Sequence, residues 1–591
     1  MAAASDGRRT FSRLLAPVVS VALAATAALA AVPSTAQAAT AATATDSRGL
    51  AWGYNNYGEL GDSTNISRSA PVAVMPGGGV TQVAAGNYHT AALLWNGEVR
   101  TWGANGNGQL GDGTKTDRPT PAPVSGLTGK FVQVAAGSSD TAAVRSDGTL
   151  WTWGYNQYGQ LGDGTTTDRS EPVQVLNLAQ VKQVSVNTVH TVALRSDGTV
   201  WTWGDNQFGE LGDGTTTKRS TPVQVPGLTG VVEVAAGAWF TLALRSDGSV
   251  WGWGYNGYGQ LGDGTNTNHA TPARVTGLSK AVSVSAGYLS SAAVRSDGTV
   301  WTWGDNQFGE LGDGTNTSRT TPVRVTGLSG VVQVSTGYSH DAAVRSDGSA
   351  WAWGYNGYGE LGDGTTTDST TPVAVSAGGI TQVAVGGVHT VAVQALKPVD
   401  HALPTVSGTA ANGRVLTAAR GTWTGKGPIS YAYQWQRCTA DSSSCVNLSG
   451  ATSTTYRLTH KDIGSRVRVR VYADNIGGTA GPVASKVTAV VKKAPPVKTK
   501  APTVTGTKAK GKLLTAHAGT WTGVTPIHYA YQWQRCNSRG TGCASIHGAI
   551  HTTYRLAAAD VGKRLRVNVT ATNTDGHATA HSAVTTAIKK K

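Results

Sequence analysis

One position of this sequence carries histidine repeatedly, at intervals of about 50 residues, and is the first candidate for chemistry. From the first repeat to the last it is occupied by His89, Asp140, His190, Phe240, Ser290, His340 and His389. Histidines are common metal ligands, but ligands of one ion must converge, and these are spread over separate repeats. We therefore predict no metal, no cofactor and no catalytic residues. The sequence also lacks the G-x-S-x-G, H-E-x-x-H, P-loop and C-x-x-C motifs of common enzymes.

Binding is expected where the symmetry of the repeats breaks. Aromatic residues and one histidine at variable positions form the predicted binding site: Tyr88, Trp239, Phe240, Tyr288, Tyr338 and His340. Exposed aromatic side chains are the usual anchors of protein and glycan interfaces. The alternative is that each of them fills a central channel or packs locally.

Four cysteines form a third group, as Cys438 with Cys445 and Cys536 with Cys543. An even number of cysteines predicts disulfides if the chain is exported. A shared four-cysteine metal site is the alternative, but a C-x6-C spacing differs from the usual C-x2-4-C. Each local disulfide is expected to contribute about 2–3 kcal/mol by limiting the unfolded chain.

The elements that position these residues are short strands. Trp-Gly recurs at intervals of 50 or 51 residues, at Trp52, Trp102, Trp153, Trp203, Trp253, Trp303 and Trp353. A full unit, such as 231–275, has four apolar runs of strand length, with Asp-Gly, a strong hairpin signal, between the second and third. A four-stranded repeat of this period predicts one propeller blade. The array begins with a third strand at 50–53 and ends with a second strand at 390–393. Six whole blades and one blade shared by both ends give seven.

The long loop of each repeat also carries a family signature. The segment 254–264, GYNGYGQLGDG, resembles the G-x-N-x-x-G-Q-L-G-x-G signature of regulator of chromosome condensation repeats, and 84–90 resembles a second signature that ends in His. The resemblance covers residues 48–396 and implies a seven-bladed β-propeller. The nuclear member of this family exchanges nucleotide on a small GTPase. Secreted actinobacterial relatives include a propeller that inhibits β-lactamases by protein binding.

Residues equivalent in every blade are expected to be structural. Asn306 and Asp313, in the long loop of one repeat, have counterparts in all seven. Such side chains accept or donate backbone hydrogen bonds in turns. Calcium binding or catalysis by this pair is the alternative.

The C-terminal part is a second repeat, with an offset of 98 residues. Trp423 matches Trp521 and Tyr456 matches Tyr554. Units of about 90 residues that consist of strands around a central Trp predict a β-sandwich, and they resemble bacterial Ig-like domains. The domains we expect are a signal peptide 1–38, a segment 39–47, the propeller 48–396, a linker 397–404, an Ig-like domain 405–491, a Lys/Pro-rich linker 492–502, a second Ig-like domain 503–588 and a basic tail 589–591.

Charge is unevenly distributed between these parts. Residues 1–396 hold 22 basic and 28 acidic residues, net −6, whereas residues 397–591 hold 27 basic and 6 acidic residues, net +21. A basic section favours polyanions such as cell-wall polymers. Alternating Arg466, Arg468 and Arg470 are the predicted polyanion contacts; a merely solvated strand face is the alternative.

The N-terminus has the pattern of an export signal. Arg8, Arg9 and Arg13 precede an apolar stretch, and Ala36-Gln37-Ala38 is an A-x-A cleavage pattern. Arg8-Arg9-Thr10-Phe11 also resembles a twin-arginine signal, so either Sec or twin-arginine export is open. We expect a secreted or envelope-associated monomer, with no membrane-spanning segment after signal removal and no nucleic-acid partner.

The function expected is that of an exported, non-enzymatic adaptor whose propeller face binds a protein. The alternatives are an inhibitor of an extracellular enzyme, a carbohydrate or wall-polymer binder, a hydrolase or lyase with an unfamiliar site, and, last, a guanine-nucleotide exchange factor.

Overall fold

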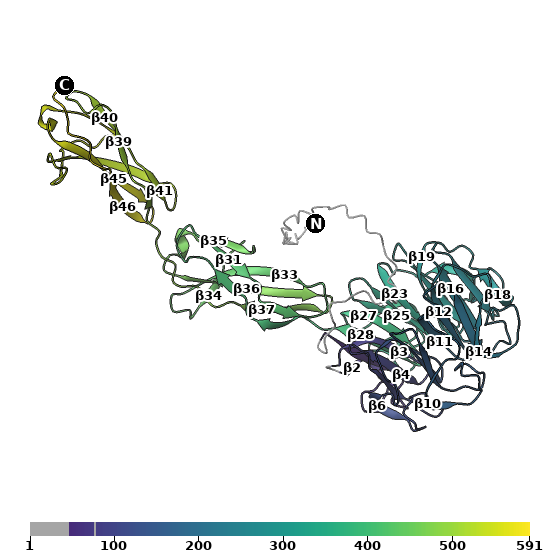
Figure 1. The fold of residues 1–591 in the computed structure, drawn as a ribbon. Helices are drawn as coiled ribbons and strands as arrows, with labels where there is room; N and C mark the ends of the chain where they lie inside the picture. The colour runs from purple at the N-terminus through teal and green to yellow at the C-terminus, as the bar shows by residue number, and fades with distance from the viewer. Residues whose placement is uncertain (1–45, 76–77) are drawn as a thin grey trace, which may run out of the picture.

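The chain forms a propeller followed by two smaller β-domains (Figure 1). A computed structural model describes residues 46–75 and 78–591. The predicted signal peptide, 1–38, lies outside the described residues, as does most of segment 39–47. None of the helices in the described part of the chain is long and apolar enough to cross a membrane.

Seven four-stranded antiparallel sheets form the propeller. The innermost strands are β3 (Val80–Ala85), β7 (Phe131–Ala136), β11 (Val181–Val186), β15 (Val231–Ala236), β19 (Ala281–Ala286), β23 (Val331–Thr336) and β27 (Ile380–Val385). The second strands are β4 (His89–Leu94), β8 (Asp140–Arg145), β12 (His190–Arg195), β16 (Phe240–Arg245), β20 (Ser290–Arg295), β24 (His340–Arg345) and β28 (His389–Ala395).

The third strand of each blade is mostly buried, and the fourth strand is partly exposed. The third strands are β1 (Ser47–Gly53), β5 (Val99–Gly103), β9 (Leu150–Gly154), β13 (Val200–Gly204), β17 (Val250–Gly254), β21 (Val300–Gly304) and β25 (Ala350–Gly354). The outermost are β2 (Arg68–Val74), β6 (Arg118–Pro123), β10 (Arg169–Gln174), β14 (Arg219–Gln224), β18 (His269–Arg274), β22 (Arg319–Arg324) and β26 (Ser369–Ala374).

The shared blade closes the ring as predicted. Its strand order is β2-β1-β28-β27, so the first two strands of the chain complete the last sheet. The register is continuous from Ser47 opposite Ala395 to Gly53 opposite His389. This pairing covers strand edges that would otherwise be free to pair with other chains.

A tryptophan in each third strand ties neighbouring blades together. Trp253 is fully buried, and its indole N–H donates to the backbone carbonyl of Glu210, in the loop of the preceding blade, at 2.9 Å. Equivalent bonds of 2.7–2.9 Å are made by Trp52, Trp102, Trp153, Trp203, Trp303 and Trp353. The same tryptophan therefore packs in the core and holds the long loop of the preceding blade in place.

The strand directions give the propeller two different faces. The loop face, as we call it, carries the turns between first and second strands and the long loops between third and fourth strands. A bond from the backbone N–H of Tyr255 to the carbonyl of Trp239, 2.8 Å, joins one such loop to one such turn. The turn face is the opposite one, with the tight turns between second and third strands and the links between blades.

The two C-terminal domains, 397–491 and 492–591, have matching strands and cores. The first has β29 (Val399–Ala402), β30 (Thr405–Ser407), β31 (Val415–Ala419), β32 (Thr422–Thr424), β33 (Ser430–Cys438), β34 (Cys445–Asn447), β35 (Thr455–Arg457), η1 (His460–Asp462), β36 (Arg466–Asn475) and β37 (Gly478–Ala484). The second has β38 (Val497–Lys500), β39 (Thr503–Thr505), β40 (Leu513–His517), β41 (Thr520–Thr522), β42 (His528–Cys536), β43 (Ala544–Ser545), β44 (Thr553–Arg555), η2 (Ala558–Asp560), β45 (Arg564–Asn573) and β46 (Gly576–His581). Trp435 and Trp533 are the fully buried centres of the two cores.

The predicted linkers are not free spacers. Within 397–404, β29 pairs with β32, and within 492–502, β38 pairs with β41. Lysine and proline favour exposed, extended chain, but an extended chain still presents backbone groups that an edge strand can pair with. Both segments are therefore part of the domains that follow them.

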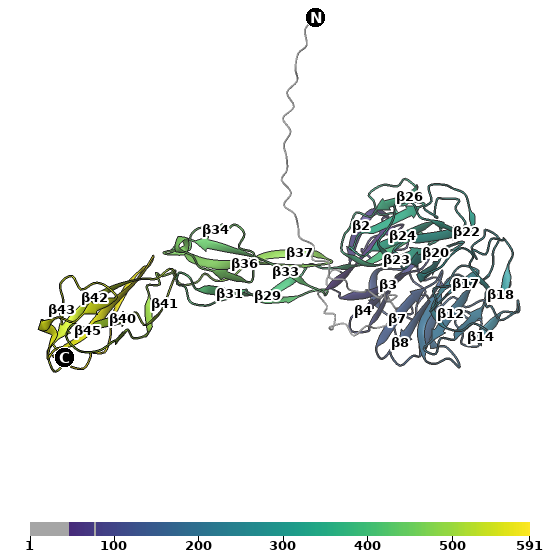
Figure 2. The ribbon, with the colours of Figure 1, turned by 90° about the horizontal axis from the view of Figure 1, so that it is seen from above.

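The first C-terminal domain docks on the turn face of the propeller. The side chain of Ile476 lies against Gly348, in a tight turn, and the Nδ2 of Asn475 donates to the carbonyl of Leu396 at 3.0 Å. The two C-terminal domains then extend away from the propeller in both views (Figures 1 and 2). The loop face is left uncovered by them.

Candidate functional site

The recurring histidines are buried bonds between blades. His89 and His190 are fully buried, and their Nε2 atoms lie 2.9 Å from the hydroxyls of Thr141 and Thr241 in the next blade. Each threonine donates its own proton to a loop carbonyl, as Thr241 does to that of Glu210 at 3.0 Å. The histidine must therefore be the donor, so its Nε2 carries the proton.

Burial keeps these rings neutral. It lowers the pKa of His89 to about 4 and that of His190, His340 and His389 to about 3. The described residues contain no group of three or more His, Cys, Asp or Glu side chains that could hold a metal ion.

For two of the predicted binding residues, Phe240 and His340, the prediction is therefore wrong. Phe240 is 0% exposed and His340 is 1% exposed, so neither can touch a partner. His340 bonds to Thr390 of the next blade at 2.8 Å, and Phe240 packs in the core between blades. Second strands are buried on both faces, so the polar–apolar alternation that would mark an exposed position is missing.

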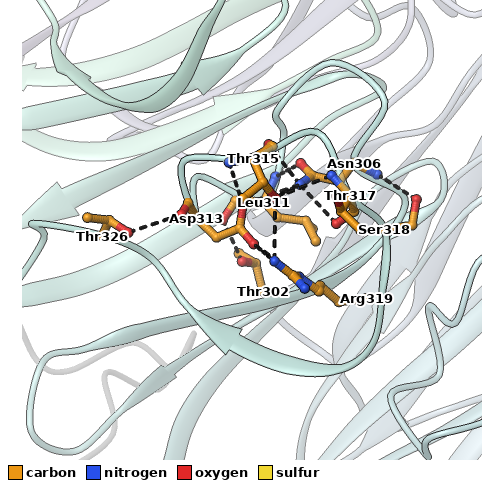
Figure 3. A network of polar contacts seen from close by, with 9 residues as sticks. All are labelled: Thr302, Asn306, Leu311, Asp313, Thr315, Thr317, Ser318, Arg319 and Thr326. Carbon is orange, nitrogen blue, oxygen red and sulfur yellow. Dashed lines mark hydrogen bonds and ion pairs between the residues drawn. The ribbon is translucent and has the colours of Figure 1, made fainter.

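The recurring Asn and Asp residues have the predicted structural role (Figure 3). The Nδ2 of Asn306 donates to the carbonyls of Thr315 and Thr317 at 3.0 and 3.1 Å, and its Oδ1 accepts the N–H of Leu311 at 2.9 Å. Asp313 accepts from Arg319 at 2.8 Å. Asn306 and Asp313 therefore make their hydrogen bonds within the loop and fix the shape of the loop face.

Three of the predicted aromatic residues do converge on the loop face. Trp239 lies edge-on to Tyr288 with ring centroids 5.1 Å apart, and Tyr288 stacks on Tyr338 at 3.9 Å. Tyr338 is 44% exposed. Burial and the neighbouring Tyr338 raise the pKa of the Tyr288 hydroxyl, so it remains a neutral donor at physiological pH.

These rings form a wall of a cavity of about 720 Å³. The long loops supply lining residues that the sequence analysis missed: Phe208, Tyr255, Asp305, Phe308 and Glu310. Phe208 and Tyr255 contact each other at 4.8 Å, and Tyr255 lies 6.3 Å from Trp239. One signal was available: the position of Asp305 is Tyr or Ala in five of the seven blades.

Tyr88 belongs to a different group on the same face. It lies 5.3 Å from Tyr57 and 6.0 Å from Tyr54, and Tyr54 lies 4.8 Å from Tyr358. These residues come from the shared blade and from the blade on each side of it. Tyr88 is thus absent from the described lining of the aromatic cavity, but it lies near enough to Tyr338 for the two hydroxyls to interact electrostatically.

The inner channel is narrow and polar. Its volume is about 290 Å³, and it is lined by the innermost strands. Glutamines there bridge blades: Gln183 donates to the carbonyl of Val234 and accepts its N–H, at 2.9 and 3.0 Å. Glu233 takes this place in one blade, and burial raises its pKa to about 7. The glutamines span the gaps between blades instead of presenting free groups to a ligand.

The C-terminal domains contain the predicted disulfides and the predicted arginine stripe. The disulfides Cys438–Cys445 and Cys536–Cys543 are both present and are local, as expected. Arg466, Arg468 and Arg470 lie along one face of β36, each partly exposed. Arg466 donates to the carbonyls of Ala440 and Thr488, and Arg468 donates to Oε1 of Gln436 at 2.7 Å. The stripe therefore also holds its own domain together.

Comparison with known proteins agrees with the propeller. Residues 48–392 match the family model of the RCC1-like domain. The chain is 35% identical over 128 residues to the ultraviolet-B receptor UVR8 of Arabidopsis thaliana, which is 21% of this chain and 29% of the receptor. It is 35% identical over 138 residues to the human E3 ubiquitin-protein ligase HERC2, which is 23% of this chain and 3% of the ligase. The matches thus span less than a third of these curated relatives.

Solved structures show the same fold. Human WBSCR16 is 25% identical, with a TM-score of 0.54, over 59% of this chain and 98% of that one. Prp20p of Saccharomyces cerevisiae is 23% identical, with a TM-score of 0.55, over 60% of this chain and 93% of that one. Because the family model covers more than half of the sequence, this chain belongs to the RCC1-like domain family.

Proposed function

We propose that this protein is an exported binding protein that holds a protein partner on the loop face of its propeller. The observation that carries the proposal is the aromatic cavity of Trp239, Tyr288 and Tyr338. Their positions break the symmetry of the repeat, and the rings are partly exposed in contact with one another. Clustered aromatic anchors in a concave site are typical of protein interfaces.

The direction of the C-terminal domains supports this choice of face. They attach to the turn face through Ile476 and Asn475, so a partner on the loop face meets no part of them. RCC1-like propellers are often protein-binding modules, whereas the fold by itself specifies no chemistry.

The C-terminal domains are proposed to be Ig-like spacers close to an anionic envelope. The same loop makes the joint in both: Asn475 donates to the carbonyl of Leu396, and Asn573 donates to that of Ala494, each at 3.0 Å. Their net charge of +21 favours anionic polymers. The Arg466, Arg468 and Arg470 stripe is the proposed contact.

Export is part of the proposal. The N-terminal pattern of basic residues, apolar stretch and A-x-A supports it. Two disulfides also favour an oxidising compartment over a reducing cytosol.

The test is capture of a partner from native culture medium and envelope extract by the immobilised chain. A double variant, Trp239→Ser with Tyr338→Ser, takes the residues that other blades have at these positions, Ser139 and Ser138. We expect a protein retained by the wild type and lost by the variant. Equal retention by both, or retention of none, would contradict a partner at this site.

A further inference from the structure

The charge of the aromatic cavity is one-sided. Its described lining residues include two acidic side chains, Asp305 and Glu310, and no basic one; the rest are aromatic, amide, hydroxyl or aliphatic. The faces of aromatic rings attract cations. Carboxylates beside such rings therefore favour a positively charged occupant.

Asp305 is held in place for this role. Its Oδ1 accepts the backbone N–H of Asn306 at 2.9 Å and the hydroxyl of Ser318 at 3.0 Å. These bonds fix the carboxylate at the cavity wall and leave Oδ2 for a ligand.

A near-copy of this loop shows what is special about Asp305. Residues 201–215 and 301–315 are identical, so Asp205 has the same immediate sequence as Asp305. Burial raises the pKa of Asp205, and the positive charge of nearby Lys218 opposes that rise, whereas Ser318 occupies the equivalent place beside Asp305. Of these two aspartates, the one that lines the cavity, Asp305, is therefore the one without a lysine at this neighbouring position.

Glu310 supplies a second acidic group, although burial raises its pKa to about 7, so Asp305 carries the negative charge of the cavity at higher acidity. Its Oε2 accepts the N–H of Phe308 at 2.8 Å, which orients the side chain. Glu310 is 2% exposed, nearly as buried as the equivalent Glu59, Glu210 and Glu360, but it differs from them in lining the cavity.

We propose that the cavity between Trp239, Tyr288, Phe308 and Asp305 binds an arginine side chain of the protein partner. A guanidinium is planar, stacks on aromatic rings and donates several hydrogen bonds at once, which suits carboxylates placed beside ring faces. The stacked Tyr288 and Tyr338 form a preorganised wall for it. This inference rests on the proposed function and adds the chemistry of the partner.

The experiment uses the mature full chain and three capped pentapeptides, Gly-Gly-X-Gly-Gly, with X as arginine, lysine or citrulline. Citrulline has the shape of arginine without its charge. We expect calorimetry to detect the arginine peptide, with the citrulline peptide at least about tenfold weaker. Equal affinities, or no arginine-peptide binding up to about 5 mM, would overturn the proposal.

Variants locate the contact. Asp305→Asn and Ser318→Lys, the latter copying Lys218, are each expected to weaken the arginine peptide about tenfold. Asp205→Asn and Lys218→Ser are the matched controls in the identical loop and should leave its affinity unchanged. Unchanged affinity in both cavity variants would place the peptide elsewhere and contradict the proposal.

The two proposals fail separately. Suppose that a partner is captured by the wild type, lost by the Trp239→Ser, Tyr338→Ser variant and retained by Asp305→Asn. That result would support the loop-face function and contradict the arginine proposal.

Discussion

The imidazole Nε2 of His389 lies 2.8 Å from the hydroxyl of Thr90, across the point where the two ends of the propeller meet. Thr90 donates its own proton to the carbonyl of Glu59 at 2.8 Å, so His389 donates to Thr90. This bond between residues 299 positions apart thus ties β28, the last strand of the propeller, to the first whole blade.

Removing this bond should weaken the propeller. His389→Ala deletes a buried ring and leaves Thr90 without its donor, with an expected cost of about 2–4 kcal/mol. Differential scanning calorimetry should show a lower transition temperature for the propeller. Ser290→Ala is the control, because Ser290 has the equivalent position but its buried hydroxyl has no hydrogen-bond partner among the described residues. A similar small change in both variants would contradict the role given to His389.

Asp341 leads to the opposite expectation, a stabilising variant. It stands where five blades have threonine, and within the described part of the chain both of its buried carboxylate oxygens lack a hydrogen-bond partner. Burial and the nearby Glu310 raise its pKa well above the usual value. Asp341→Thr should restore the donor to a loop carbonyl and stabilise the propeller by about 1–2 kcal/mol. An unchanged or lower unfolding temperature would show that Asp341 is bonded in a way that this account omits.

The buried loop glutamates predict a distinct pH dependence. Burial raises the pKa of Glu210 to about 7, so the folded state binds a proton more tightly than the unfolded state does. The stability from this proton is complete below pH 4.5 and is lost as the pH rises toward 7. Glu210→Gln copies Gln160 and Gln260 of other blades and has no such proton to lose. Its free energy of unfolding, relative to that of the wild type, should therefore increase by up to about 3 kcal/mol over that pH range.

The readout for Glu210 is the difference in unfolding free energy between variant and wild type at pH 4.5 and pH 8. The difference is needed because the buried histidines act in the other direction. Their lowered pKa values mean stability that is present above pH 6.5 and lost toward pH 3–4. A difference that does not change with pH would contradict a protonated Glu210.

The joint between the C-terminal domains depends on Asp575. Its carboxylate accepts the Nδ2 of Asn412 at 2.8 and 2.9 Å and the backbone N–H of Ala494 at 2.8 Å. Asp575→Ala should loosen this joint without unfolding either domain. Small-angle X-ray scattering is expected to show a broader distribution of interdomain distances, and an unchanged profile would mean that other contacts hold the joint.

The regular parts of the fold were predictable from the sequence because the residues that form them recur in every repeat. The period of Trp-Gly, the Asp-Gly turns and the missing strands at each end sufficed for seven blades and their closure. The seven-residue spacing sufficed for the pairing of Cys438 with Cys445. These features depend on contacts that are local or repeated in every blade.

The candidate site was only partly predictable. Trp239, Tyr288 and Tyr338 were found because they differ between repeats, but Phe240 and His340 differ too and are buried. Asp305 was missed because its loop is identical to that of Asp205, and the distinction lies in Ser318. The contact of Asp575 with Asn412 joins residues 163 positions apart in unlike surroundings, and no periodicity reports it.

The central claim, a protein partner on the loop face, is tested most directly by site-specific photo-crosslinking. One probe replaces Tyr338 on the loop face, and a second replaces the exposed Asp297 in a tight turn on the opposite face. In native culture medium and envelope extract, the account predicts one crosslinked protein from position 338 and none from 297. A crosslink from position 297 alone, or the same product from both positions, would contradict it.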